Sequence, residues 1–319
     1  MLLNEYKTQH STDVSSNGKV VIITGANSGV GLAAAKRFAM GGAHVVMVCR
    51  SKDRGEAAKK EIEAVANGPV DLHLADLSVL AEVRDVSERL LAAYEQIHVL
   101  INNAGLHSDA LSFTDDGFET CWAVNHLAPF LMTMLLLDRM KESAPARIIN
   151  VSSQGHRFCG VDLNDLDWKT RNYRGLKGYG QSKTANLFFT WELARQLEGT
   201  GVTCNAQHPG GVKSRIGSNN SAGWRAIHAV ISLGLKDPSI SGEALYWMGA
   251  APEMADVTGK FFNLTIQEKP HWHAIHKGHE LLARNTWLLS EQHCGLVKST
   301  VDPKAPVKKQ SRKTSASAN

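Results

Sequence analysis

A buried strand that leads directly into a glycine-rich loop and a helix constrains the fold of this 319-residue chain more than any other feature. Lys19 to Thr24 (KVVIIT) is a β-branched apolar run, which is typical of a strand buried on both faces of a parallel sheet. Gly25 to Gly31 follows, and Leu32 to Met40 is an alanine-rich segment with the composition of a helix. Ala43 to Cys49 (AHVVMVC) predicts the next strand. Together these segments predict a βαβ unit.

The alternation of strands and helices continues along the chain. Further strands are predicted near Val70 to Leu74, His98 to Asn102, Arg147 to Ser152 and Val202 to Gln207, separated by segments long enough for crossover helices. Lys260 to Asn263 (KFFN) is expected to add an edge strand. The sequence therefore predicts an α/β protein with a single doubly wound parallel sheet of the Rossmann type and helices on both faces.

The expected organisation is one large α/β domain with short additions. We expect a polar N-terminal extension at residues 1–18, the α/β domain at 19–265, a C-terminal cap at 266–301 and a disordered basic tail at 302–319. Within the cap, His271 to Leu289 is interpreted as helical or irregular.

Composition excludes several classes of protein. The net charge is only +4, and the excess lies largely in the last twenty residues, so nucleic acid is not expected as a partner. Five scattered cysteines without CxxC spacing favour a reducing compartment. The richest apolar run, Phe130 to Leu137, is shorter than the roughly 18 residues that a membrane-spanning helix needs, and is interpreted as part of a core helix.

The glycine-rich loop has the position of a phosphate-binding loop. Backbone amides and the start of the following helix can face a pyrophosphate, although the GxxxGxG spacing differs from the commoner GxGxxG pattern. The second strand ends at Arg50, where an NAD site would normally have an acidic residue for the ribose hydroxyls. A guanidinium suits a 2′-phosphate, and Lys52 adds positive charge nearby. NADP is therefore the expected cofactor, with NAD disfavoured.

Tyr179 and Lys183 are four residues apart in a predicted helix and therefore share one face. A phenol with a pKa near 10 is a poor acid-base group at neutral pH, and we expect the neighbouring ammonium to lower that pKa.

Several motifs in a fixed order resemble the short-chain dehydrogenase/reductase superfamily: Thr24 to Gly31, Asn102-Asn103-Ala104-Gly105, Asn125, Ser152-Ser153, Tyr179 to Lys183 and Pro209-Gly210. The resemblance covers roughly residues 18–265 and implies that the domain at 19–265 is a dinucleotide-binding catalytic domain. Gly117-Phe118-Glu119, Val124 to Leu127, Ala144 to Arg147 and Val151 to Ser153 are similar to the retinol dehydrogenase-like branch of this superfamily.

The resemblance implies a role for each matching residue. Ser153 would hydrogen-bond the substrate carbonyl, Tyr179 would donate the proton, and Lys183 would also hold the nicotinamide ribose. Asn125 would position a water in a proton relay, and Asp76 would reach the adenine. The full set of implied cofactor-binding residues is Gly25, Asn27, Ser28, Gly29, Val30, Gly31, Arg50, Asp76, Leu77, Asn103, Ala104, Gly105, Tyr179, Lys183, Pro209, Gly210 and Val212.

One departure from the family motif has a physical consequence. Where the motif usually reads NHLGHF, this chain has Asn125 to Phe130 as NHLAPF. Pro129 has no N–H, so in a helix it cannot bond the Asn125 carbonyl and should kink the chain. That carbonyl could then bind water, or the kink could be without catalytic consequence.

The expected activity is NADPH-dependent interconversion of an apolar aldehyde or ketone and its alcohol, most readily in the reductive direction, with a lid near residues 213–235. Two alternatives remain: a photoenzyme similar to protochlorophyllide reductase, and a cofactor-sensing binding or scaffold protein. The histidines between His271 and His279 are interpreted as a partly solvated surface, so no metal is expected. A cytoplasmic location without a transmembrane segment is expected, while peripheral membrane contact and homo-oligomer formation stay open.

Overall fold

The computed structural model describes residue 4 and residues 7–212, 221, 235–276 and 278–297 of the chain. The described residues form one eight-stranded sheet in the order β3-β2-β1-β4-β5-β6-β7-β8. Neighbouring strands from β3 to β7 pair in parallel, and β8 is antiparallel to β7. The predicted doubly wound α/β sheet is confirmed.

The strands lie close to the segments that the sequence predicts. Their bounds are β1 (Val20–Thr24), β2 (His44–Cys49), β3 (Val70–Leu74), β4 (Val99–Asn102), β5 (Ala146–Val151), β6 (Val202–His208), β7 (Phe261–Asn263) and β8 (Ile266–Gln267). The strand predicted at Lys260 to Asn263 is confirmed as β7, but its expected place at the edge of the sheet is wrong. The chain turns back after β7, and β8 pairs with it through Phe262 with Gln267 and Asn263 with Ile266, so the two-residue β8 becomes the edge.

The described helical segments are α1 (Gly29–Met40), α2 (Lys52–Glu63), α3 (Leu80–Ala93), α4 (Thr120–Trp122), the π-helical turn η2 (Ala123–Leu127), α5 (Ala128–Glu142), the 3₁₀ turn η3 (Gln154–Arg157), α6 (Gly175–Gln196), α8 (Ser239–Ala250), the 3₁₀ turn η4 (Pro252–Met254), α9 (Trp272–Ile275) and α10 (His279–His293).

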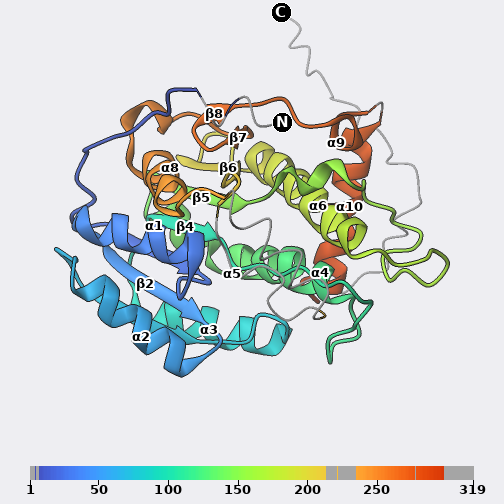
Figure 1. Cartoon of the computed structure of the whole chain (residues 1–319), viewed down its shortest axis with the longest axis horizontal. Helices are drawn as coiled ribbons and strands as arrows, with labels where there is room; N and C mark the ends of the chain where they lie inside the picture. Colours follow the sequence, from blue (N-terminus) through green and yellow to red (C-terminus); the bar gives the residue numbers. More distant parts are fainter. Residues whose placement is uncertain (1–3, 5–6, 213–220, 222–234, 277, 298–319) are drawn as a thin grey trace, which may run out of the picture.

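Two apolar cores fill the two faces of the sheet. One joins α1, α2 and α8 to the sheet, and the other joins α3, α5, α6 and α10 to it. Strand β1 divides its side chains between them: Val21 and Ile23 belong to the first core and Ile22 to the second. Figure 1 shows α1 beside α8 and α6 beside α10, as their contacts require. The β1 side chains therefore alternate between the two cores, as expected for a strand that is buried on both faces of the sheet.

One helix of the second core is long and apolar enough to cross a membrane. It runs from Thr120 to Glu142, through α4, η2 and α5, with a mean hydropathy of 1.4 over its most apolar 18-residue window. In the fold, 83% of that window is buried. The predicted core helix around Phe130 to Leu137 lies within it, and its apolar side chains contact the protein interior.

Residues 7–18 of the N-terminal extension run past α8 toward the turn between β7 and β8 (Figure 1). Tyr246 on α8 donates a hydrogen bond to the Val14 carbonyl at 2.5 Å, and the His10 ring stacks on Trp247 at 5.1 Å. Thr265 donates its backbone N–H and its hydroxyl to Gln9 Oε1, at 3.1 and 2.8 Å. The expected tail at 302–319 and the expected lid, apart from Ser221 and Leu235, lie outside the described residues.

Candidate active site

A cavity of about 770 Å³ opens at the carboxyl ends of the parallel strands. This is where doubly wound sheets bind ligands, because the strand order reverses between β1 and β4. Its walls include nearly every candidate residue: Gly25, Asn27, Ser28, Gly29, Val30, Arg50, Asp76, Leu77, Asn103, Ala104, Gly105, Ser153, Tyr179, Lys183, Pro209, Gly210 and Val212. Of the candidate residues, Gly31 and Asn125 do not line it.

The glycine loop packs tightly against the end of β4. Gly25 has a φ of +68°, and a Cβ on Gly31 would lie 2.4 Å from Asn103 Nδ2 and 2.5 Å from the Gly25 carbonyl oxygen. Asn103 in turn donates from Nδ2 to the Thr24 carbonyl at 2.8 Å. Gly31 therefore supports the loop from behind, which explains why it is absent from the cavity wall.

The start of α1 fits an anionic group. The N-cap residue Ser28 makes no side-chain hydrogen bond to the first turn, and Ser28, Gly29 and Val30 line the cavity. Helix N-termini attract phosphate because their first amides lack intrahelical partners. The loop thus fits the pyrophosphate of a dinucleotide.

The far end of the cavity is positively charged. Arg50 Nη1 lies 3.5 Å from Asp76 Oδ2, and the Arg50 side chain is 53% exposed. Asp76 Oδ1 also accepts from the Ser78 backbone N–H at 2.9 Å and hydroxyl at 2.7 Å, so this carboxylate helps to orient the guanidinium. Arg54 of α2 lines the cavity, whereas Lys52, which the sequence suggested, does not.

Tyr179 and Lys183 lie on one face of α6, with Lys183 Nζ 5.6 Å from the centre of the Tyr179 ring. The ammonium donates to the Val151 carbonyl at 2.9 Å, and burial lowers the Lys183 pKa to about 8. Burial raises the Tyr179 pKa to about 12, although the Ser153 hydroxyl opposes this shift. The expected net lowering of the Tyr179 pKa is therefore wrong: desolvation of the buried phenol outweighs any effect of the ammonium, which donates to a backbone carbonyl.

Ser153 begins the turn η3 beside the Tyr179 ring. Its hydroxyl accepts from the Gly155 backbone N–H at 2.9 Å. A Cβ on Gly155 would lie 2.6 Å from Cε1 of Tyr179, so only glycine fits there without movement. The preceding Ser152 donates its hydroxyl to the Lys183 carbonyl at 3.1 Å. The two serines thus have different roles. Ser152 connects the end of β5 to α6 through a hydrogen bond, and Ser153 lies next to the Tyr179 phenol.

Asn125 lies in the π-helical turn η2 and is buried. Its Oδ1 accepts from the Leu106 N–H at 2.8 Å, and its Nδ2 donates to the Leu106 carbonyl at 2.9 Å and to Ser182 Oγ at 3.0 Å. The side chain therefore joins the loop after β4 to α6. The departure from regular helix that Pro129 predicts takes the form of this π turn, which ends where α5 begins.

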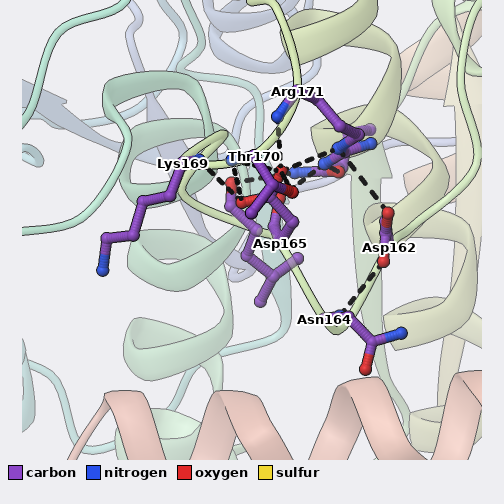
Figure 2. A network of polar contacts seen from close by, with 8 residues as sticks. Asp162, Asn164, Asp165, Lys169, Thr170 and Arg171 are labelled. Atoms are coloured by element: carbon purple, nitrogen blue, oxygen red, sulfur yellow. Dashed lines mark hydrogen bonds and ion pairs between the residues drawn. The ribbon is translucent and has the colours of Figure 1, made fainter.

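The segment before α6 is anchored by Asp165, as Figure 2 shows. Asp165 accepts hydrogen bonds from the backbone of Lys169 and from both the backbone and hydroxyl of Thr170. These bonds and Arg171 outweigh burial, which acts in the opposite direction, and lower the Asp165 pKa to about 2. Arg171 also reaches Gln181 Oε1 at 3.2 Å, two residues after Tyr179.

Sequence reasoning missed two histidines at the site. His107 is buried, lines the cavity, and its ring lies 5.7 Å from the Tyr179 ring. His156 is buried directly behind Ser153. Neither belongs to a motif, and a search for surface charge or metal spacing would not find them. Among the described residues, no group of three histidine, cysteine or acidic side chains could hold a metal ion, including the segment from His271.

Comparisons with known proteins identify the family of this chain. Residues 19–223 match the family model described as short chain dehydrogenase. Human retinol dehydrogenase 13 is 37% identical over 304 residues, covering 93% of this chain and 91% of that protein. Mouse retinol dehydrogenase 12 is 40% identical over 287 residues, covering 90% of this chain and 89% of that protein.

Solved structures share the same fold. The Pseudomonas aeruginosa RhlG/NADP active-site complex is 25% identical with a TM-score of 0.63, over 80% of this chain and 96% of that one. The 3-ketoacyl-(acyl-carrier-protein) reductase from Brucella melitensis complexed with NADH is 28% identical with a TM-score of 0.61, over 78% of this chain and 97% of that one.

Proposed function

Because the chain belongs to the short-chain dehydrogenase/reductase family and is retinol dehydrogenase-like, we propose that it reduces an apolar aldehyde or ketone to its alcohol with NADPH. The observation that carries the proposal is the grouping of Ser153, Tyr179 and Lys183 in one wall of the cavity. A cytoplasmic location is part of the proposal. It rests on the nearly neutral charge of the chain before its last twenty residues and on five scattered cysteines without CxxC spacing.

The nicotinamide cofactor that this family binds supplies the hydride when bound. The Ser153 hydroxyl donates a hydrogen bond to the substrate carbonyl oxygen and polarises it. Tyr179 is a neutral phenol at pH 7, because its pKa is raised to about 12, and it therefore holds the proton that this oxygen needs. A protonated phenol suits reduction better than oxidation.

Lys183 and Asn125 support this proton transfer. The Lys183 ammonium, held by the Val151 carbonyl beside the ring, stabilises the negative charge left on Tyr179 after the proton leaves. Asn125 holds the loop after β4 against α6, and so fixes the position of this part of the cavity wall relative to the Tyr179 phenol. A Cβ on Gly105 would lie 3.2 Å from Asn125 Oδ1 and 3.5 Å from Lys183 Nζ, so the groups converge closely there.

The substrate class rests on the apolar part of the same wall. Leu106, Val124, Val212 and Leu235 are apolar residues that line the same cavity as Ser153, Tyr179 and Lys183. Such a surface favours an apolar carbonyl compound over a charged one, because a charge buried there would lose its hydration.

The direct test is an NADPH-oxidation assay with aldehydes and ketones of increasing chain length. We expect turnover that rises with the apolar length of the substrate, and a collapse of turnover in Tyr179→Phe with NADPH affinity retained. NADPH binding without turnover of any carbonyl would instead favour a cofactor-sensing protein. Light-dependent turnover of a bound pigment, seen by absorbance, would favour the photoenzyme.

Cofactor preference is tested separately through Arg50. A charge-assisted pairing with the 2′-phosphate contributes about 1.5 to 3 kcal/mol, so NADPH should bind roughly tenfold or more tightly than NADH. Arg50→Asp should reverse this order, because a carboxylate repels phosphate and accepts from ribose hydroxyls. Lys52→Asp is the matched control, since Lys52 does not line the cavity and should change the ratio little. Equal affinity of the unaltered protein for both cofactors, titrated at one ionic strength, would refute the preference.

A further inference from the structure

His156 is a buried imidazole directly behind the candidate catalytic serine. It lies in η3, is fully buried, and its ring contacts the Phe261 ring edge-on at 5.2 Å. Its Nδ1 lies 2.6 Å from the Ser153 carbonyl oxygen, and its Nε2 lies 3.0 Å from the His271 backbone nitrogen. The ring therefore spans two segments that are 115 residues apart in the sequence.

These two contacts define the protonation of the ring. A carbonyl oxygen can only accept, so Nδ1 must carry the hydrogen. A backbone N–H can only donate, so Nε2 must carry the lone pair. Only the neutral Nδ1–H tautomer satisfies both. Burial, together with the nearby Arg157, His208 and His271, lowers the His156 pKa to about 4, while the hydrogen bond to the Ser153 carbonyl acts in the opposite direction.

One end of this bridge is the backbone of Ser153. The Ser153 carbonyl also accepts the His156 backbone N–H at 3.2 Å, so the imidazole and the turn itself hold the same oxygen. On the other side of that residue, the Ser153 hydroxyl accepts from the Gly155 N–H. A rotation of the Ser153 peptide would therefore move the hydroxyl relative to the Tyr179 ring.

The other end is the C-terminal part of the chain. His271 begins α9, beyond residues 19–223 that match the family model. The same segment contacts η3 a second time, because Glu268 accepts from Arg157 at 2.9 Å and from Gln154 at 3.0 Å. The C-terminal segment thus holds both sides of the turn that begins with Ser153.

We propose that His156 is a positioning residue, whose imidazole fixes the Ser153 peptide against the C-terminal segment so that the Ser153 hydroxyl faces the substrate carbonyl. The proposal rests on the proposed function for the role of Ser153. The part that acts on catalysis is the Nδ1 contact to Ser153, and the Nε2 contact to His271 anchors the ring.

Two substitutions separate the contacts. In His156→Asn the amide nitrogen can occupy the position of Nδ1 and donate to the Ser153 carbonyl, but the side chain is too short to reach His271. In His156→Gln the terminal oxygen can occupy the position of Nε2 and accept from His271, while no side-chain donor remains for the Ser153 carbonyl and only the backbone N–H of residue 156 still donates to it. Both lose similar ring volume against Phe261, so each serves as the stability control for the other.

We expect His156→Gln to lower kcat about tenfold or more with little change in NADPH affinity, since small misplacements of catalytic groups cost this much. His156→Asn should keep kcat within about threefold of the parent at a similarly lowered melting temperature. A His156→Gln variant with parental kcat, or two variants whose kcat values fall together with their melting temperatures, would overturn the proposal.

A second measurement does not depend on turnover. The Gly155 amide hydrogen bonds to the Ser153 hydroxyl, so its hydrogen exchange reports the geometry of the turn. Exchange should accelerate in His156→Gln and stay near the parental rate in His156→Asn. If the protein reduces no carbonyl, this comparison still tests the positioning role, and equal exchange in both variants would reject it.

Discussion

Gly155 is the residue that brings Ser153 and Tyr179 closest together. A Cβ there would lie 2.6 Å from Cε1 and 2.8 Å from Cδ1 of the Tyr179 ring, closer than side-chain carbons approach. The ring or the turn would have to move, and both carry groups of the candidate active site.

We therefore predict that Gly155→Ala lowers kcat about tenfold or more while NADPH affinity changes little, because the phosphate loop is untouched. Gly160→Ala is the matched control: a Cβ there meets only the His273 carbonyl oxygen at an ordinary 3.5 Å, and kcat should stay near the parental value. Steady-state kinetics with NADPH titration check both. Parental kcat in Gly155→Ala would show that the phenol does not need its present position.

For single residues, the sequence predicted those site residues that lie a few positions apart in one helix, and it missed those whose partners are far away in the chain. Tyr179 and Lys183 follow from helical periodicity. His156 depends on His271, and no short window contains both. The direction in which the Tyr179 pKa shifts could not be predicted either, because the shift depends on how completely the folded chain removes water from the phenol.

Among the elements, α10 has a role that its sequence does not suggest. It packs against α6 and reaches the π turn η2, where His126 Nε2 lies 2.7 Å from Ser290 Oγ. His126 is buried next to Asn125, and Trp122 Nε1 donates to His293 Nδ1 at 3.4 Å. The C-terminal helix thus supports the turn that carries Asn125.

Ser290→Ala should destabilise the protein by about 1 to 3 kcal/mol, because it leaves a buried imidazole nitrogen without its partner. Thr286→Val is a matched control one turn earlier, since the buried Thr286 hydroxyl bonds only the Leu282 carbonyl of its own helix, and its loss should cost about 1 kcal/mol or less. Urea unfolding measures both. Equal losses of unfolding free energy in the two variants would mean that the hydrogen bond between α10 and η2 contributes nothing to stability.

Element prediction failed where the elements are short or depend on tertiary contacts. The parallel strands were found within about one residue at each end, because most of their residues are apolar or β-branched and helical segments separate them. Two-residue β8 carries no pattern at all, and only its pairing with β7 defines it. Pro129 predicted an irregular helix, but the π-helical form of η2 depends on the packing around it.

The whole molecule should be sensitive to acid through its buried histidines. Burial lowers the pKa of His126 to about 3 and of His156 to about 4, against about 6.5 in an unfolded chain. Between pH 6.5 and 4 the unfolded chain binds protons that the folded chain does not. The stability that comes from keeping these histidines neutral in the folded protein is therefore complete above pH 6.5 and is lost as the pH falls toward 4.

We predict that the free energy of unfolding falls between pH 7.5 and pH 5, by up to about 1.4 kcal/mol per pH unit for each such histidine. His156→Asn should reduce the slope, because it removes one of these two buried imidazoles. Denaturant titrations at pH 7.5, 6.5, 5.5 and 5 measure the slope. Equal stability across this range would contradict the burial of neutral histidines.

The N-terminal segment across α8 has a consequence for how the chain is made. Gln9 bonds Thr265, 256 residues later, and Val14 bonds Tyr246, 232 residues later. During synthesis Gln9 and Val14 leave the ribosome long before their partners exist. Contacts of such separation form late, because the long loop between them must first be closed by the rest of the fold. We therefore expect the segment around Gln9 and Val14 to wait for α8 and β7, and to be among the last parts of the described fold to reach its place.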